Sequence, residues 1–126
     1  MIVVDASAMV EALVGRAPDD QLLDLLAGDL HAPYLLDVEV LSALRGLELA
    51  NKIPAAVAAV AKATFFEFAI TRYETQPLAE RIWQLRHQFT AYDASYIALA
   101  EGLDASLLTC DKKLAGRGHT ATVVVC

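Results

Sequence analysis

Four acidic residues stand where the surrounding sequence is apolar: Asp5, Glu39, Asp93 and Asp111. Asp5 directly follows a short apolar run, and Asp111 follows the apolar segment "SLLTC" in the same way. Glu39 lies at the edge of the apolar face of a predicted helix, and Asp93 starts another helix. A carboxylate in an apolar environment needs a hydrogen-bonding partner, an opposite charge or a bound cation. These residues are therefore the first candidates for chemistry.

A bound metal ion accounts for all four acids together. Carboxylates that cluster without compensating bases raise one another's pKa values, and a divalent cation removes that repulsion. Ligand sets made only of oxygen select hard ions, so we expect Mg²⁺ or Mn²⁺ rather than zinc. Such ions keep bound water and are suited to phosphoryl chemistry.

Each acid also has a simpler structural interpretation. Asp is a favourable N-cap, and Asp5, Asp93 and Asp111 all stand at predicted helix starts. Glu39, at the edge of a helix, can reach solvent. The cation site is the better hypothesis because all four acids map to one end of one predicted sheet.

Strands and helices alternate along the chain, which is typical of an α/β domain with a mainly parallel sheet. Apolar or β-branched runs predict strands at residues 2–4, 31–34, 68–71, 106–109 and 120–126. Helical patterns predict helices at 7–14, 19–26, 37–52, 54–66, 77–89 and 91–103, and a short helical turn at 111–114. In parallel sheets, ligands bind beyond the carboxyl ends of the strands. Asp5 and Asp111 are predicted to lie at those ends.

Length and composition indicate one folded domain over residues 1–126, because hydrophobic residues make up 56% of the chain. No charge-free apolar run reaches the roughly 18 residues of a membrane span, and no secretory signal is recognisable. The two cysteines, Cys110 and Cys126, form no CxxC motif and predict no disulfide framework. We therefore expect a cytoplasmic protein without a membrane partner, in which Cys126 has no special role.

The net charge of −6 first argues against a nucleic-acid partner, because phosphates attract basic surfaces. This argument weakens if the acids bind metal. Two divalent cations on four carboxylates add about four positive charges locally, and such a site attracts phosphate.

The sequence lacks the motifs that mark other functional classes of α/β protein. A dehalogenase-like phosphatase requires a second Asp two residues after Asp5, where this chain has Ser7. A receiver domain requires an acidic pair at the first strand, and Asp5 stands alone there. The nucleotide-binding motifs GxGxxG, after the first strand, and GxxxxGK[ST] are both missing.

Four segments, in order and at matching spacing, resemble the PIN domain, and specifically the VapC toxins of bacterial toxin–antitoxin pairs. They span residues 2 to 114 and read "IVVDASA", "LDVEVLSALR", "LRHQFTAYDASYIALAE" and "LLTCDKKL". The resemblance places the family's acids on the four residues singled out above. It also places the family's hydroxyl residues on Ser7 and Thr109 and a basic position on Arg86.

The resemblance implies a single PIN domain with a Rossmann-like sheet that acts as an Mg²⁺- or Mn²⁺-dependent endoribonuclease. Asp5, Glu39 and Asp93 would be the core metal ligands, and Asp111 would bind through water or orient the nucleophile. The hydroxyl residues would orient carboxylates or waters, with helix capping or backbone hydrogen bonding as the alternative. A PIN-like protein that binds RNA or acts as a scaffold without cleavage is a further alternative, against which the four intact acids argue.

Basic residues near these segments are candidate phosphate contacts, namely Arg86, Lys112 and Lys113. The alternative is that they are ordinary solvated surface charges. Trp83 fits a helix packing position better than an RNA stacking platform.

The chain is unusually apolar, with a mean hydropathy of +0.43. The helical segments "MVEALV", "DQLLDLLAG" and "PAAVAAVAKATFFEF" carry more apolar side chains than one sheet face can cover. Because exposed apolar patches mark interfaces, we expect one surface for a homodimer and another for a partner. The resemblance implies that the partner is a VapB-type antitoxin. A core larger than expected is the alternative.

Overall fold

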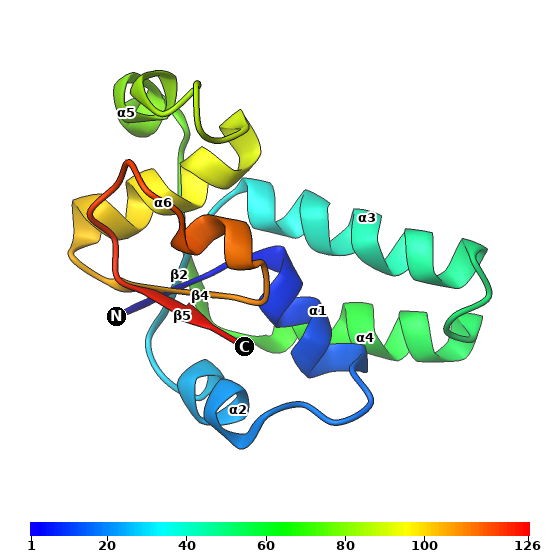
Figure 1. Ribbon diagram of the computed structural model, residues 1–126. Helices are drawn as coiled ribbons and strands as arrows, with labels where there is room; N and C mark the ends of the chain where they lie inside the picture. Colours follow the sequence, from blue (N-terminus) through cyan, green and yellow to red (C-terminus); the bar gives the residue numbers. More distant parts are fainter.

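Five short strands form one parallel sheet in the order β3-β2-β1-β4-β5 (Figure 1). The computed structural model describes residues 1–126. The strands are β1 (Ile2–Val4), β2 (Leu30–Pro33), β3 (Ile70–Tyr73), β4 (Ser106–Thr109) and β5 (Val123–Val125). Every neighbouring pair is parallel. The predicted α/β class is confirmed, and the sheet is parallel throughout.

Helices on both faces of the sheet complete the fold. They are α1 (Ala6–Val14), α2 (Asp20–Leu26), α3 (Leu35–Leu49), α4 (Ala55–Glu67), α5 (Ala79–Gln84) and α6 (Ala91–Leu103), with 3₁₀ turns η1 (Gln76–Leu78) and η2 (Lys112–Ala115). The connections β1 to β2 and β2 to β3 advance one way along the sheet, and β3 to β4 returns the other way. Because such crossovers are right-handed, α1 to α4 share one face, α6 covers the other, and α5 packs against α6 (Figure 1).

One hydrophobic core surrounds the central strands, with residues of α1 to α4 on one face and of α6 on the other. Val3 and Val4 of β1 and Leu107 and Leu108 of β4 are all buried, as uniformly apolar parallel strands require. The α6 helix is buried continuously over residues 94–100, so it forms the central layer of its face. Its Thr90 cap and its end at Asp104, in a left-handed conformation, agree with the predicted boundaries.

Several predicted elements differ from the structure at their ends, and one differs in kind. The helix expected over residues 77–89 is a 3₁₀ turn followed by the short α5, and irregular turns lead on to α6. Leu85 and Phe89 are buried there, so core packing decides the path of the chain. Trp83 was expected to pack inside, but it is 67% exposed. The third strand begins at Ile70 rather than residue 68, because α4 continues to Glu67.

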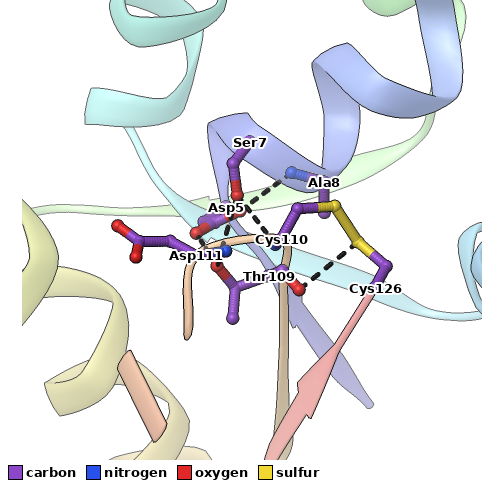
Figure 2. The surroundings of a disulfide bond; sticks show 7 residues. All are labelled: Asp5, Ser7, Ala8, Thr109, Cys110, Asp111 and Cys126. Carbon is purple, nitrogen blue, oxygen red and sulfur yellow. Dashed lines mark hydrogen bonds between the residues drawn. A yellow bond between two sulfur atoms is a disulfide. The ribbon is translucent and has the colours of Figure 1, made fainter. Parts of the chain in front are cut away.

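Cys110 and Cys126 form a disulfide bond (Figure 2), although the sequence predicted none. Parallel pairing places Thr109 of β4 opposite Val125 of β5, so the next residue of each strand lies beside the other. The two Cα atoms are 4.6 Å apart, a separation that a disulfide spans. The bond depends on this register, so the sequence pattern alone does not reveal it.

None of the helices has the combination of length and hydropathy that a bilayer crossing requires.

Candidate active site

The candidate site lies at the point where the strand order reverses. The neighbouring strands β1 and β4 have connections that leave toward opposite sides of the sheet. Such a switch point opens a crevice beyond the carboxyl ends of the strands, which is where α/β proteins bind ligands. Asp5 follows β1 here, and its backbone N–H donates to the Leu108 carbonyl of β4 at 3.1 Å. The prediction that Asp5 lies at this edge is confirmed.

Asp5 is held rigidly although it is an acid in the core. The whole Asp5 residue is only 5% exposed to solvent. Oδ1 accepts hydrogen bonds from Ser7 Oγ at 2.7 Å and from the Ala8 N–H at 3.0 Å, and Oδ2 accepts from Thr109 Oγ1 (Figure 2). Asp5 is therefore the N-cap of α1, at the carboxyl end of β1. Capping and a role in the site are compatible.

Ser7 and Thr109 connect Asp5 to the turn after β4. Ser7 Oγ accepts from the Cys110 N–H at 2.9 Å, and Thr109 Oγ1 accepts from the Asp111 N–H at 2.9 Å. The two hydroxyl oxygens are 3.2 Å apart. These contacts fix the position of the Asp5 carboxylate from both sides, as predicted for residues that orient an acid.

Glu39 is positioned by a residue that the sequence analysis did not single out. The Tyr96 O–H donates to Glu39 Oε1 at 2.6 Å, from α6 to α3. Tyr96 is almost fully buried. It lies three residues after Asp93 on the same helix, and that spacing places two side chains on one face. This spacing is the signal that was available in the sequence.

Asp93 and Asp111 complete the group of acids. Asp93 lies in the first turn of α6, whose N-cap is Thr90, so capping does not account for Asp93. Asp111 is the N-cap of η2, where it accepts from the Lys113 N–H at 3.0 Å. Its Oδ2 is 3.8 Å from Lys113 Nζ. Asp111 thus caps a helical turn, which was its structural alternative, and its charge also raises the pKa of Asp93.

The acids share one electrostatic environment. Burial raises the pKa of Asp5, and the charge of Asp93 raises it further. Burial likewise raises the pKa of Glu39, with added repulsion from Asp93 and Asp5. The pKa of Asp93 is raised by burial and then by Asp111. The site therefore holds negative charge that the protein itself does not fully neutralise.

The acids are not packed as tightly as ligands around a bound ion: no three His, Cys, Asp or Glu side chains converge closely enough in this structure to ligate one ion.

The three basic residues predicted to contact phosphate differ in their surroundings. Arg86 donates to the Trp83 carbonyl at 2.8 Å, and its guanidinium lies 4.8 Å from the centre of the Trp83 ring. Lys112 is exposed. Of the three predicted phosphate contacts, only Lys113 has an interaction with the acids.

The surface has one hollow beside the acids and another between helices. One, of about 430 Å³, lies beside the site and is lined by Ser7 and Glu39, together with Glu11 and Ser42. The other is an apolar groove of about 600 Å³ between α1, α2 and α4. We call it the helix groove; its lining includes Leu13, Leu23, Leu26, Val57, Val60 and Phe68.

Comparison with a solved structure identifies the fold. The crystal structure of PAE2754 from Pyrobaculum aerophilum matches with a TM-score of 0.74 at 24% sequence identity. The match covers 97% of this chain and 82% of that chain. The arrangement of the parallel sheet and its helices is therefore shared by a known protein.

Comparison of sequences identifies the family. The model of the PIN domain matches residues 2–118. Ribonuclease VapC9 of Mycobacterium tuberculosis (strain ATCC 25618 / H37Rv) is 45% identical over 120 residues, 94% of this chain and 92% of the relative. Ribonuclease VapC12 of the same strain is 38% identical over 125 residues, 98% of this chain and 97% of the relative. The chain belongs to the PIN domain family, and within it to the group of the VapC ribonucleases.

Proposed function

We propose that the chain is a metal-dependent endoribonuclease that acts as the toxin of a toxin–antitoxin pair. The observation that carries the proposal is the group of acids at the strand switch point, whose pKa values are raised together by burial and mutual repulsion. The relatives named as ribonucleases supply the substrate class. RNA carries the phosphodiester groups that a cation held by these acids attracts.

The donor set suits Mg²⁺ or Mn²⁺. The acids near this end of the sheet offer only oxygen: Asp5, Glu39 and Asp93 would be direct ligands, and Asp111 would act through water or as an orienting group, although no three of these side chains converge on one point in this structure. Hard divalent ions prefer such ligands. When bound, the ion supplies an activated water nucleophile and stabilises the negative charge that develops on the phosphate.

Hydrogen bonds within the protein orient two of these acids, Asp5 and Glu39, without a bound ion. Asp5 accepts three hydrogen bonds, from Ser7, Ala8 and Thr109, and a carboxylate has about four acceptor positions, so about one remains for the crevice. Tyr96 occupies Glu39 Oε1 and leaves Oε2 available. Rigid hydrogen bonding of this kind orients ligands and reduces the entropy lost on binding.

Lys113 is the strongest candidate for a phosphate contact. Its position beside Asp111 places its ammonium at the edge of the site. Lys112 and Arg86 are exposed and belong to the same proposal as secondary contacts. Charge removal at Lys113 should weaken RNA binding and reduce its salt dependence.

We further propose that the helix groove receives a segment of a VapB-type antitoxin. Its lining is apolar apart from Thr64, and Val60 at its rim is 67% exposed. Exposed apolar surface of this kind marks an interaction site. Other exposed apolar residues, Val38 and Leu49 of α3, support the proposed homodimer surface. Toxicity on expression of the chain alone, relieved by co-expression of the neighbouring gene product, is the expected result.

The decisive experiment maps cleavage sites on total cellular RNA with the purified chain. Specific new 5′ ends should appear with Mg²⁺ or Mn²⁺ and disappear with a chelator. Retained RNA binding without cleavage, under both conditions, would support the alternative of a non-catalytic RNA-binding or scaffold protein. Release of inorganic phosphate from small phosphomonoesters, without RNA cleavage, would support the phosphatase alternative.

A further inference from the structure

The disulfide bond adjoins the candidate site through a chain of direct contacts. Cys110 stands between Thr109, whose hydroxyl donates to Asp5, and Asp111, the last of the predicted acids. The Cys110 N–H donates to Ser7 Oγ, the other hydroxyl that holds Asp5. Figure 2 shows this arrangement, with the disulfide next to the turn formed by residues 109–111. Cys110 is therefore next to Asp111 in the chain and two hydrogen bonds away from Asp5, through Ser7.

The bond also ties an edge strand to the site. β5 pairs only with β4 and is three residues long. The Cys126 N–H donates to the Thr109 carbonyl at 2.8 Å, so the end of β5 adds a backbone contact to the same turn. The segment closed by the bond, residues 110–126, carries Asp111, Lys112 and Lys113. Leu114 in the core and the hydrogen bonds from Thr120 to Glu101 hold the middle of this segment. At its C-terminal end, the covalent bond adds to the hydrogen bonds of a three-residue edge strand and to the partial burial of Val123 and Val124.

Small thiols and disulfides can reach the pair. Cys126 is exposed, and Cys110 is partly exposed. Both line a hollow of about 340 Å³ whose other walls include Glu11, Asp19 and Leu22. Exposed disulfides exchange more readily with small thiols than buried ones do.

We propose that Cys110 and Cys126 form a reversible redox site that locks the 109–111 turn and thereby regulates metal binding by the acids; this rests on the proposed metal-dependent function. The oxidant is a low-molecular-weight disulfide, RSSR. One protein thiol displaces RSH to form a mixed protein–SR disulfide, and the second protein thiol then attacks the protein sulfur and displaces the second RSH. In sum, two protein thiols and RSSR become one protein disulfide and two RSH, and a small dithiol reverses the reaction.

The disulfide form is the one with the ordered site. Reduction loosens the turn, because Cys110 loses its tie to β5 while the Thr109 and Ser7 hydroxyls depend on the position of that turn. Residues that orient metal ligands change metal affinity by about 10-fold to 100-fold when removed, so a loosened turn should lower Mn²⁺ affinity by about threefold to tenfold.

The test combines a readout without metal and a readout with it. Backbone amide exchange is measured by NMR on the metal-free protein, oxidised and after dithiothreitol, and the amides of Cys110 and Asp111 should exchange faster after reduction. The Asp93 amide, which is bonded to Thr90 instead, serves as the internal control. Mn²⁺ binding is then measured by calorimetry in both states. The Cys126→Ser variant should behave like the reduced protein and should not respond to dithiothreitol.

The outcomes separate this inference from the proposed function. Equal exchange of the Cys110 and Asp111 amides in both states overturns the lock, whether or not the protein binds metal. Faster exchange with unchanged Mn²⁺ affinity overturns the regulation. If neither state binds Mn²⁺, the proposed metal-dependent function fails and the regulation of metal binding fails with it, while the exchange data still decide whether the disulfide orders the turn.

Discussion

Helix α6 carries one carboxylate near each end, and their environments are opposite. Near the end of the helix, Glu101 accepts hydrogen bonds from Arg81 Nε at 2.7 Å and Nη2 at 3.0 Å, and from the Thr120 N–H at 2.8 Å. The Arg81 hydrogen bonds lower the pKa of Glu101 to about 2. At the start of the same helix, Asp93 faces other acids, and its pKa is raised by burial and by Asp111.

The difference distinguishes an acid that stabilises the fold from acids that serve a site. Glu101 joins α5, α6 and the segment before β5 by satisfying its charge within the chain. The acids at the switch point keep charge that only Lys113 offsets from nearby. Uncompensated charge destabilises a folded protein, so its presence at the strand ends supports the proposed cation site.

Replacement of Asp93 by Asn should cause the largest effect. We expect RNA cleavage to fall by about 100-fold or more, because a metal ligand becomes a neutral amide. The metal-free variant should unfold at the wild-type temperature or above it, since one repelling charge is gone. Cleavage rates on total RNA and thermal unfolding by circular dichroism measure the two effects. Near-normal cleavage by the variant would remove Asp93 from the proposed ligand set.

Replacement of Glu101 by Gln is the matched control on the same helix and should have the reverse profile. Loss of the charged hydrogen bonds to Arg81 should lower the free energy of unfolding by about 1–2 kcal/mol, because the Arg81 side chain is partly exposed to solvent. Cleavage should remain within about twofold of wild type once folding is complete.

The same variant has a characteristic pH dependence. The folded-state pKa of Glu101 is depressed, so its stabilisation is present above the unfolded value of about 4.3 and is lost as the pH falls toward about 2. The stability difference between wild type and Glu101→Gln, measured by urea unfolding, should therefore shrink from pH 6 to pH 2.5. A difference that stays constant over this range would show that the ion pair is not its source.

Replacement of Tyr96 by Phe tests how the uncompensated acids are oriented. The variant keeps the buried ring and removes only the hydrogen bond to Glu39. We expect Mn²⁺ affinity to fall by about tenfold, typical for loss of a group that orients a metal ligand. Calorimetry measures the affinity, and the Tyr92→Phe variant, at an exposed tyrosine of the same helix, is the control. Equal Mn²⁺ affinity in the two variants would limit Tyr96 to core packing.

The sequence alone was sufficient for features that depend on local pattern. The strand before Asp5, the whole of α6 and the strand before Cys110 were predicted within about one residue, because apolar runs and caps mark them directly. Asp5 and Asp111 follow from the rule that chemistry lies at the carboxyl ends of parallel strands.

Features that depend on contacts between distant segments were not predictable in this way. Tyr96 meets Glu39 across 57 residues, and the disulfide joins positions 16 apart through the β4–β5 register. The exposed Trp83 and the short α5 have a similar cause: burial of Leu85 overrides the local helical pattern. Tertiary packing decided each of these outcomes.

The smallest expected effect is the dependence of metal stabilisation on pH. The pKa values of Asp5, Glu39 and Asp93 are raised in the folded state. The stability they contribute without metal is therefore present below their unfolded values of about 4 and is lost as the pH rises through the raised values. A cation binds the deprotonated acids, so it restores stability only where they are charged. At ten times its dissociation constant, Mn²⁺ should add about 1.4 kcal/mol at pH 7 and less at pH 5.

Thermal unfolding with Mn²⁺ or chelator at the two pH values measures this difference, and the Asp93→Asn protein supplies the control. That variant should gain little from Mn²⁺ at either pH, whereas Glu101→Gln should gain as much as wild type, because its altered acid belongs to the compensated group. Equal Mn²⁺ stabilisation of all three proteins would mean that the ion binds elsewhere. The two ends of α6 would then differ in charge balance without differing in function.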